Sequence, residues 1–170
     1  MQKITPMLWF DNQADEAAKF YTSVFSGAPG GTSSKLGTIT HYGEAVSKAA
    51  GRPAGSVMTA SFELNGQEFV ALNGGPAFKF TEAVSFVVTC ETQEEVDYFW
   101  NKLSEGGQES ACGWLKDKFG LSWQVTPTML INAMTGPDHE RSQRVMQAML
   151  SMKKIIIADL EKTRSTDLWQ

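Results

Sequence analysis

The feature that most constrains the fold is a pattern of strand, helix and strands that occurs twice within about 130 residues. The first copy opens with an apolar run over residues 3–10, followed by residues 11–27 with apolar side chains at helical spacing, and then by three strand-like segments. The second copy opens with the apolar run 83–90 and continues with a helical segment over 92–107. This pattern indicates an internal duplication and an α+β fold of two similar modules.

The ends of both helices carry recognisable signals. Asp11 or Asn12 is expected to cap the first helix, and Gly27 is expected to end it. In the second helix Thr92 and Glu95 have the spacing of a capping box. These signals set the helix boundaries to within a turn.

The strands are separated by turn signals. Residues 49–55 are predicted to form a loop, and Asn65-Gly66 lies between two β-favouring runs, which is a strong signal for a tight hairpin. A second hairpin is expected around Asp117 to Gly120. Each module is therefore predicted to contain a strand, a helix and three further strands.

Composition excludes some classes of partner. The chain has 170 residues, 42% hydrophobic and 20% charged, and a net charge of −4, so it offers no basic surface for nucleic acid. No apolar run approaches the length of a membrane span, and no signal peptide is apparent at the start. The two cysteines form no disulfide or zinc pattern. We expect a cytoplasmic protein that does not bind membranes.

The segment after the second module has a different character. A helix is predicted over about 138–150, whereas Lys153–Leu160 is compatible with either a strand or a helix. A methionine-rich surface of Met146, Met149, Leu150 and Met152 either packs on its own domain or forms a subunit interface. The predicted organisation is a first module over 1–80, a second over 81–135 and a C-terminal helical extension over 136–170 that contributes to a homodimer.

Several phrases resemble a known family. They are "ITPMLWFDNQADEAAKFYTSVF", "GQEFVALNGGPAFKF", "QEEVDYFWNKLSEGG" and "CGWLKDKFGLSWQVTP". They are similar to the PhnB-like family named 3-demethylubiquinone-9 3-methyltransferase, within the vicinal oxygen chelate superfamily of glyoxalases, bleomycin resistance proteins and dioxygenases. The resemblance implies two βαβββ modules that form an eight-stranded sheet around a cup, and a dimer.

The glycine pattern does not favour the methyl transfer in the family's name. A methyl-donor enzyme of the doubly wound kind needs a glycine-rich turn between a strand and a helix. The glycine doublets at 30–31, 74–75 and 106–107 follow a helix, a strand and a helix, and none opens a helix after a strand. We therefore expect another activity.

The resemblance also implies where metal ligands would stand, and these positions hold poor ligands. The first expected histidine falls at about Pro6, and its counterpart in the second module falls at Val84 or Ser85. The last strand of the first module offers only apolar residues over 70–72. Gln124 occupies the position of the glutamate in the second module, and an amide lacks the charge that holds a divalent ion. We expect no metal and no other cofactor.

The turn between Lys116 and Leu121 leaves two registers open. If these two residues pair, Cys112 and Trp114 face the helix layer; a turn longer by one residue places both in the cup with Gln124. The resemblance favours the longer turn, because the superfamily has a cup-facing aromatic residue ten positions before the glutamate.

In the longer register Cys112, Trp114, Ser122 and Gln124 line one wall of the cup, with Leu8 opposite. An apolar aromatic pocket with a few polar groups is typical of a site for a small organic ligand. The predicted function is therefore small-molecule binding or metal-independent catalysis, for which the Cys112 thiol is the one candidate nucleophile. The alternative is a metal-dependent lyase or dioxygenase of the superfamily.

Overall fold

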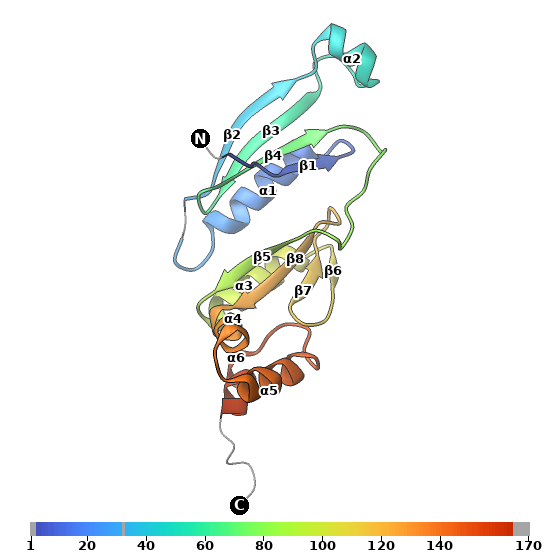
Figure 1. Cartoon of the computed structure of the whole chain (residues 1–170). Helices are drawn as coiled ribbons and strands as arrows, with labels where there is room; N and C mark the ends of the chain where they lie inside the picture. The colour runs from blue at the N-terminus through green and yellow to red at the C-terminus, as the bar shows by residue number, and fades with distance from the viewer. Residues whose placement is uncertain (1–2, 32, 165–170) are drawn as a thin grey trace, which may run out of the picture. The chain divides into compact units, whose positions relative to one another are not determined.

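The structure is a computed structural model that describes residues 3–31 and 33–164, and the chain divides into two compact units between residues 80 and 81 (Figure 1). The first unit contains a four-stranded sheet in the order β1-β4-β3-β2, with β1 parallel to β4 and the other neighbours antiparallel. Its elements are β1 (Met7–Phe10), α1 (Ala14–Ser26), β2 (Lys35–His41), α2 (Glu44–Ala50), β3 (Val57–Leu64) and β4 (Gln67–Asn73).

The second unit repeats this topology. Its sheet has the order β5-β8-β7-β6, and its first strand is again parallel to its fourth. The prediction of an α+β fold with two βαβββ modules and C-terminal helices is confirmed. The elements are β5 (Ser85–Cys90), α3 (Gln93–Ser104), β6 (Gln108–Glu109), β7 (Trp114–Lys116), β8 (Ser122–Pro127), α4 (Thr128–Thr135), α5 (His139–Met149), α6 (Ile157–Glu161) and the 3-10 helix η1 (Lys162–Arg164).

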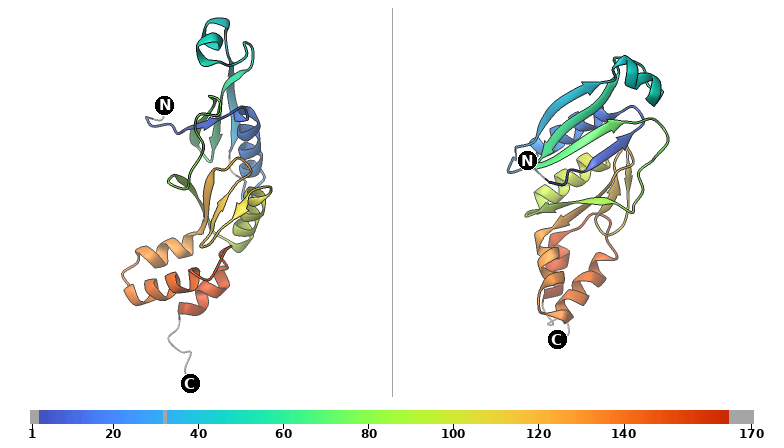
Figure 2. Two further views of the ribbon diagram at one scale, coloured as in Figure 1. Left: turned by 90° about the vertical axis from the view of Figure 1, so that its right-hand side faces the viewer. Right: turned by 45° about the horizontal axis from the view of Figure 1, so that its top comes forward.

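Each unit buries one face of its sheet under one helix, as the edge-on view in Figure 2 shows. In the first unit the ring of Tyr21 on α1 lies 5.9 Å from that of Phe62, which stacks on Phe69 across the β3–β4 pair. Cross-strand aromatic pairs of this kind stabilise a sheet beyond their buried area. In the second unit α3 buries the predicted apolar stripe, which consists of Val96, Phe99, Trp100 and Leu103.

The start of α1 is capped by a residue far along the chain. Asn73, at the end of β4 and 4% exposed, accepts a hydrogen bond from the Ala14 N–H through its Oδ1 at 2.8 Å. Its amide donates to the first carbonyl of β3 at 3.1 Å, and its own carbonyl accepts from the Tyr42 hydroxyl at 2.6 Å. The expectation of a cap from Asp11 or Asn12 is wrong, because the tertiary fold supplies the acceptor.

The remaining local signals are found where they were expected. Gly27 is the C-cap of α1, and Thr92 and Glu95 form the capping box of α3. The β3–β4 hairpin turns at Asn65 and Gly66, whose φ values of 50° and 81° are the pair of positive angles that a type I′ turn requires.

The helix α2 was not predicted. It lies at the end of the β2–β3 hairpin (Figure 1), begins after Gly43 and ends at Gly51, which has a left-handed φ of 64°. None of its seven residues is buried. A helix so short and without an apolar face leaves no periodic signal, and the predicted loop shortens to the residues that follow it.

The C-terminal helices of the second unit enclose a small apolar cluster. The segment left open as strand or helix is irregular through Ile156 and becomes α6 from Ile157. Met149 and Met152 pack on the cluster, whereas Leu150 is 69% exposed. Among the helices of the described chain, none is long and apolar enough to cross a bilayer. The cluster is formed by Leu130, Ala133, Val145, Ile155 and Leu160.

The role of Asn73 predicts the effect of removing its side chain. Asn73→Ala leaves the Ala14 N–H without its acceptor, and we expect the free energy of unfolding to fall by about 2–3 kcal/mol in urea denaturation. The matched control is Asn12→Ala, an exposed asparagine for which we expect a change within about 0.5 kcal/mol. An equal loss in both variants would show that Asn73 is not the cap.

Candidate functional site

The hairpin of β7 and β8 determines which side chains reach each face of the second sheet. Because Lys116 pairs with Ser122 and not with Leu121, the longer of the two predicted turns is confirmed. Trp114 and Gln124 consequently share the face opposite α3, here called the far face. The three cross-strand pairs are Trp114 with Gln124, Leu115 with Trp123, and Lys116 with Ser122.

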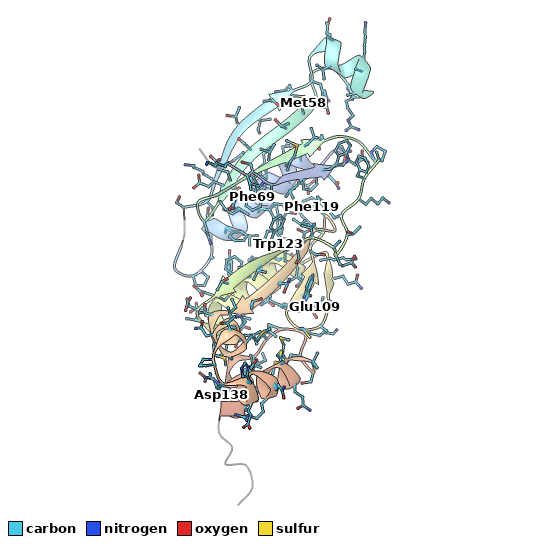
Figure 3. The ribbon with its side chains drawn as sticks, in the orientation of Figure 1. Met58, Phe69, Glu109, Phe119, Trp123 and Asp138 are labelled. Atoms are coloured by element: carbon cyan, nitrogen blue, oxygen red, sulfur yellow. The ribbon has the colours of Figure 1, made fainter. Side chains whose placement is uncertain are left out.

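Asp117 organises this turn from inside the protein. Its side chain is buried, and Oδ1 accepts hydrogen bonds from the backbone N–H groups of Phe119 at 2.9 Å and Leu121 at 3.1 Å. Oδ2 accepts from Nε1 of Trp123 at 2.9 Å, so that the turn and this core tryptophan share one carboxylate. Trp123 and the turn residue Phe119 are labelled in Figure 3. Asp117 was predicted only as a turn residue, and its bond to Trp123 has no signal in the sequence.

A pocket of about 140 Å³ opens on the far face. Its lining includes two of the predicted ligand-binding residues, Trp114 and Ser122, and Gln124 lies beside them as the strand partner of Trp114. The pocket therefore brings an indole ring, a hydroxyl and an amide together. The other polar lining residues are Glu82, Gln108, Ser110 and Lys116.

Ser122 is an unusual polar residue in this pocket. It is 1% exposed, and its Oγ is buried without a hydrogen-bond partner among the residues that the structure describes. Buried hydroxyl groups nearly always have a partner, and an unmet one costs about 1–3 kcal/mol. A ligand atom that bonds to this hydroxyl would remove the cost.

Lys116 and Glu82 form an ion pair at the same pocket. The hydrogen bond from Lys116 is the main reason that the pKa of Glu82 lies below its usual value, and a backbone hydrogen bond within Glu82 adds to it. The sequence analysis identified neither Lys116 nor Glu82 as a residue that lines the pocket. Lys116 could have been found, because it lies two residues after Trp114 on one strand, but Glu82 belongs to a connection with no periodicity.

The donor set on the far face does not fit a divalent metal ion. Gln124, at the position where the resemblance implies a glutamate, donates from Nε2 to Oγ of Ser85 at 2.9 Å. Ser85 is itself one of the two positions where a histidine was sought. An amide and a hydroxyl that bind each other offer no negative charge to a cation. Within residues 3–31 and 33–164, His, Cys, Asp and Glu side chains form no group of three that could hold a metal.

Cys112 is not among the residues that line the pocket. It precedes β7 in a turn with a φ of 59°, and its thiol is 3.7 Å from the carbonyl oxygen of Met149. The backbone N–H groups of Cys112 and Gly113 donate to the carbonyls of Met152 and Lys153, both at 2.8 Å. The chain at Cys112 is not a strand, so the alternation used to place it on the wall does not apply, and the structure puts it against the C-terminal segment.

Leu8 also lies elsewhere than expected. It pairs with Ala71 in the first unit, is 6% exposed, and shares its face with the buried Phe10. That face packs on α1, and the alternation of β1 directs Met7 and Trp9 to the opposite face. Leu8 is therefore a core residue of the first unit, which corrects its assignment to a ligand site.

The second cysteine, Cys90, is a core residue as well. It is fully buried, and this burial, together with the charges of Glu95 and Glu91, raises the pKa of its thiol to about 12. At neutral pH the thiol stays protonated and is a poor nucleophile.

The two modules share one strand order, and one helix covers each sheet, so the chain is an α+β protein of two similar βαβββ modules. The second module carries the pocket on its far face. The chain matches the 3-demethylubiquinone-9 3-methyltransferase family over residues 2–126, and it belongs to this family. The match ends before α4, so the C-terminal helices lie outside it.

Comparison with solved structures agrees with this assignment. The PhnB protein of Bacillus cereus is 40% identical, with 75% of this chain and 100% of that chain covered and a TM-score of 0.63. Protein PA1353 of Pseudomonas aeruginosa shares the fold at 20% identity and a TM-score of 0.57, covering 75% and 98% of the two chains. No curated protein matches the chain.

The buried carboxylate of the hairpin turn leads to a prediction about stability. Asp117→Ala removes the acceptor of three hydrogen bonds, and we expect the free energy of unfolding to fall by about 2–4 kcal/mol. Lys118→Ala in the same turn removes an exposed side chain and should change it by less than about 0.5 kcal/mol. Chemical denaturation followed by tryptophan fluorescence measures both, and a mild effect of Asp117→Ala would mean that the turn does not depend on the carboxylate.

The donor set leads to a prediction about metals. Isothermal titration with Zn²⁺, Mn²⁺, Fe²⁺ and Ni²⁺ should give no stoichiometric site, because Gln124 and Ser85 supply no charge. The matched variant Gln124→Ala should give the same titration as the wild type. A stoichiometric site that this substitution abolishes would contradict the prediction.

Proposed function

We propose that this protein binds a small planar organic molecule in the pocket on the far face of its second sheet. The observation that carries the proposal is the buried Oγ of Ser122, which lacks a partner among the described groups and belongs to a residue that lines the pocket. A hydroxyl kept in such a place is explained if its partner is a ligand.

The neighbours of Ser122 support a planar ligand. Trp114 lines the pocket with a half-buried indole, which offers a broad apolar face for stacking. Gln124 uses its Nε2 for Ser85, and this bond orients the amide on the far face. Apolar walls with a few placed polar groups are the usual composition of small-molecule sites.

Two other functions are less well supported. The family name describes methyl transfer, but the connections from β1 to α1 and from β5 to α3, residues 11–13 and 91–92, contain no glycine to approach a methyl donor. A thiol enzyme would use Cys112, whose sulfur faces a backbone carbonyl of the C-terminal segment instead of the pocket residues. The proposal is therefore binding, with the pocket residues Trp114 and Ser122 as the main contacts.

The proposal can be tested by titrating the ¹⁵N-labelled protein with benzamide and benzoate. We expect at least one of these planar probes to shift the amide signals of Trp114, Ser122 and Gln124. Trp114→Ala should weaken the binding roughly tenfold, because the stacking face is lost. The control Phe78→Ala removes an exposed aromatic ring of the first unit and should leave binding unchanged. If neither probe shifts these signals, the proposal is wrong.

A measurement of the free energy of unfolding, which needs no ligand, tests the same proposal. Ser122→Ala should weaken probe binding, yet leave the free energy of unfolding unchanged or raise it by up to about 1 kcal/mol, because it removes an unsatisfied buried group. The matched control is Ser61→Ala: the Oγ of Ser61 accepts from the Thr38 N–H at 2.7 Å, so its loss should cost about 1 kcal/mol. Equal losses in the two variants would mean that Ser122 has a partner within the protein.

A further inference from the structure

The position of Lys116 in the pocket carries information about the ligand's charge. Lys116 lies directly across the β7–β8 pair from Ser122, so the two side chains leave the far face as neighbours. Both residues line the pocket. A ligand atom that reaches the Ser122 hydroxyl is consequently also within the field of the lysine ammonium group.

The ion-pair partner of Lys116 is replaceable. Glu82 belongs to the connection that precedes β5, and its side chain is 62% exposed, against 36% for Lys116. Exposed ion pairs contribute little to stability, since water solvates both charges once they separate. The pKa of Glu82 lies below its usual value, so its carboxylate is ionised at neutral pH. It therefore pairs with the Lys116 ammonium group whenever no other anion is bound there.

We propose, on the basis of the binding function above, that the ligand is a planar carboxylate and that its carboxylate displaces Glu82 from Lys116. One carboxylate oxygen accepts from the ammonium group of Lys116 and the other from the hydroxyl of Ser122, while the ring lies on Trp114. A carboxylate has two oxygens that only accept, and the two neighbouring groups on the protein are donors. A neutral ligand would leave Lys116 with Glu82 and gain no charge-assisted bond.

The remaining polar groups of the pocket agree with an anion. Gln108 is the strand partner of Lys116 on β6 and carries an amide donor to the same face, and the Ser110 hydroxyl can also donate. Glu82 is the one acidic residue in the lining of this pocket, and it is the group that the ligand replaces. Glu82 therefore acts as an internal competitor, and its removal should help an anionic ligand.

This mechanism is tested by comparing benzoate with benzamide, which have the same ring and nearly the same shape but differ in charge. Dissociation constants come from the NMR titration of wild type, Lys116→Met and Glu82→Gln. We expect benzoate to bind about tenfold more tightly than benzamide, and Lys116→Met to remove that advantage. Glu82→Gln should tighten benzoate binding by about two- to fivefold, because the competing carboxylate is gone, and should leave benzamide within about twofold.

The opposite directions of the two substitutions separate this mechanism from a structural role of the ion pair. If the pair only supported the pocket, both variants would weaken both probes. Benzamide binding equal to or tighter than benzoate binding, or weaker benzoate binding in Glu82→Gln, would overturn the anion proposal and leave the binding function standing. If neither probe binds the wild type, both proposals fail. Thermal unfolding of each variant verifies that it is folded.

Discussion

The buried carboxylate of Asp117 is the interaction on which the candidate site depends. By accepting hydrogen bonds from two backbone groups of its own turn and from the Trp123 ring, it sets the length of the turn between β7 and β8. In a hairpin, a change of one residue in that length would move every side chain of one strand to the opposite face. Trp114 would then face α3, and the pocket would lose its aromatic wall.

The two units show how one topology can serve different ends. Both sheets place the first strand parallel to the fourth and bury one face under a helix. In the first unit the connection to the helix is held by Asn73, which joins α1 to β3 and β4. In the second unit the helix α3 has its own capping box. The polar side chains of Ser122 and Gln124 lie on the far face of that sheet.

On the far face, a pair of neutral side chains stands at the positions where the family resemblance implies metal ligands. These side chains, Gln124 and Ser85, bind each other. Ser122 lies directly across the β5–β8 pair from Ser85, and its hydroxyl has no partner among the described groups. A neutral amide and hydroxyl need no cation to be stable in a partly buried position, because each satisfies the other. The charge that remains at the pocket is the exposed pair of Lys116 and Glu82.

The sequence by itself determined the duplicated strand and helix order, the capping box of α3, the Asn65-Gly66 turn and the poor metal ligands at Gln124 and Ser85. These features rest on local spacing and on residue chemistry, which a single chain displays directly. Tertiary structure decided that Asn73 caps α1 and that Leu8 lies in the core. It also decided that Cys112 lies against the C-terminal segment and that Lys116 pairs with Glu82. Each of these depends on which distant segments meet and on which face a strand turns inward, and neither is encoded in the spacing of neighbouring residues.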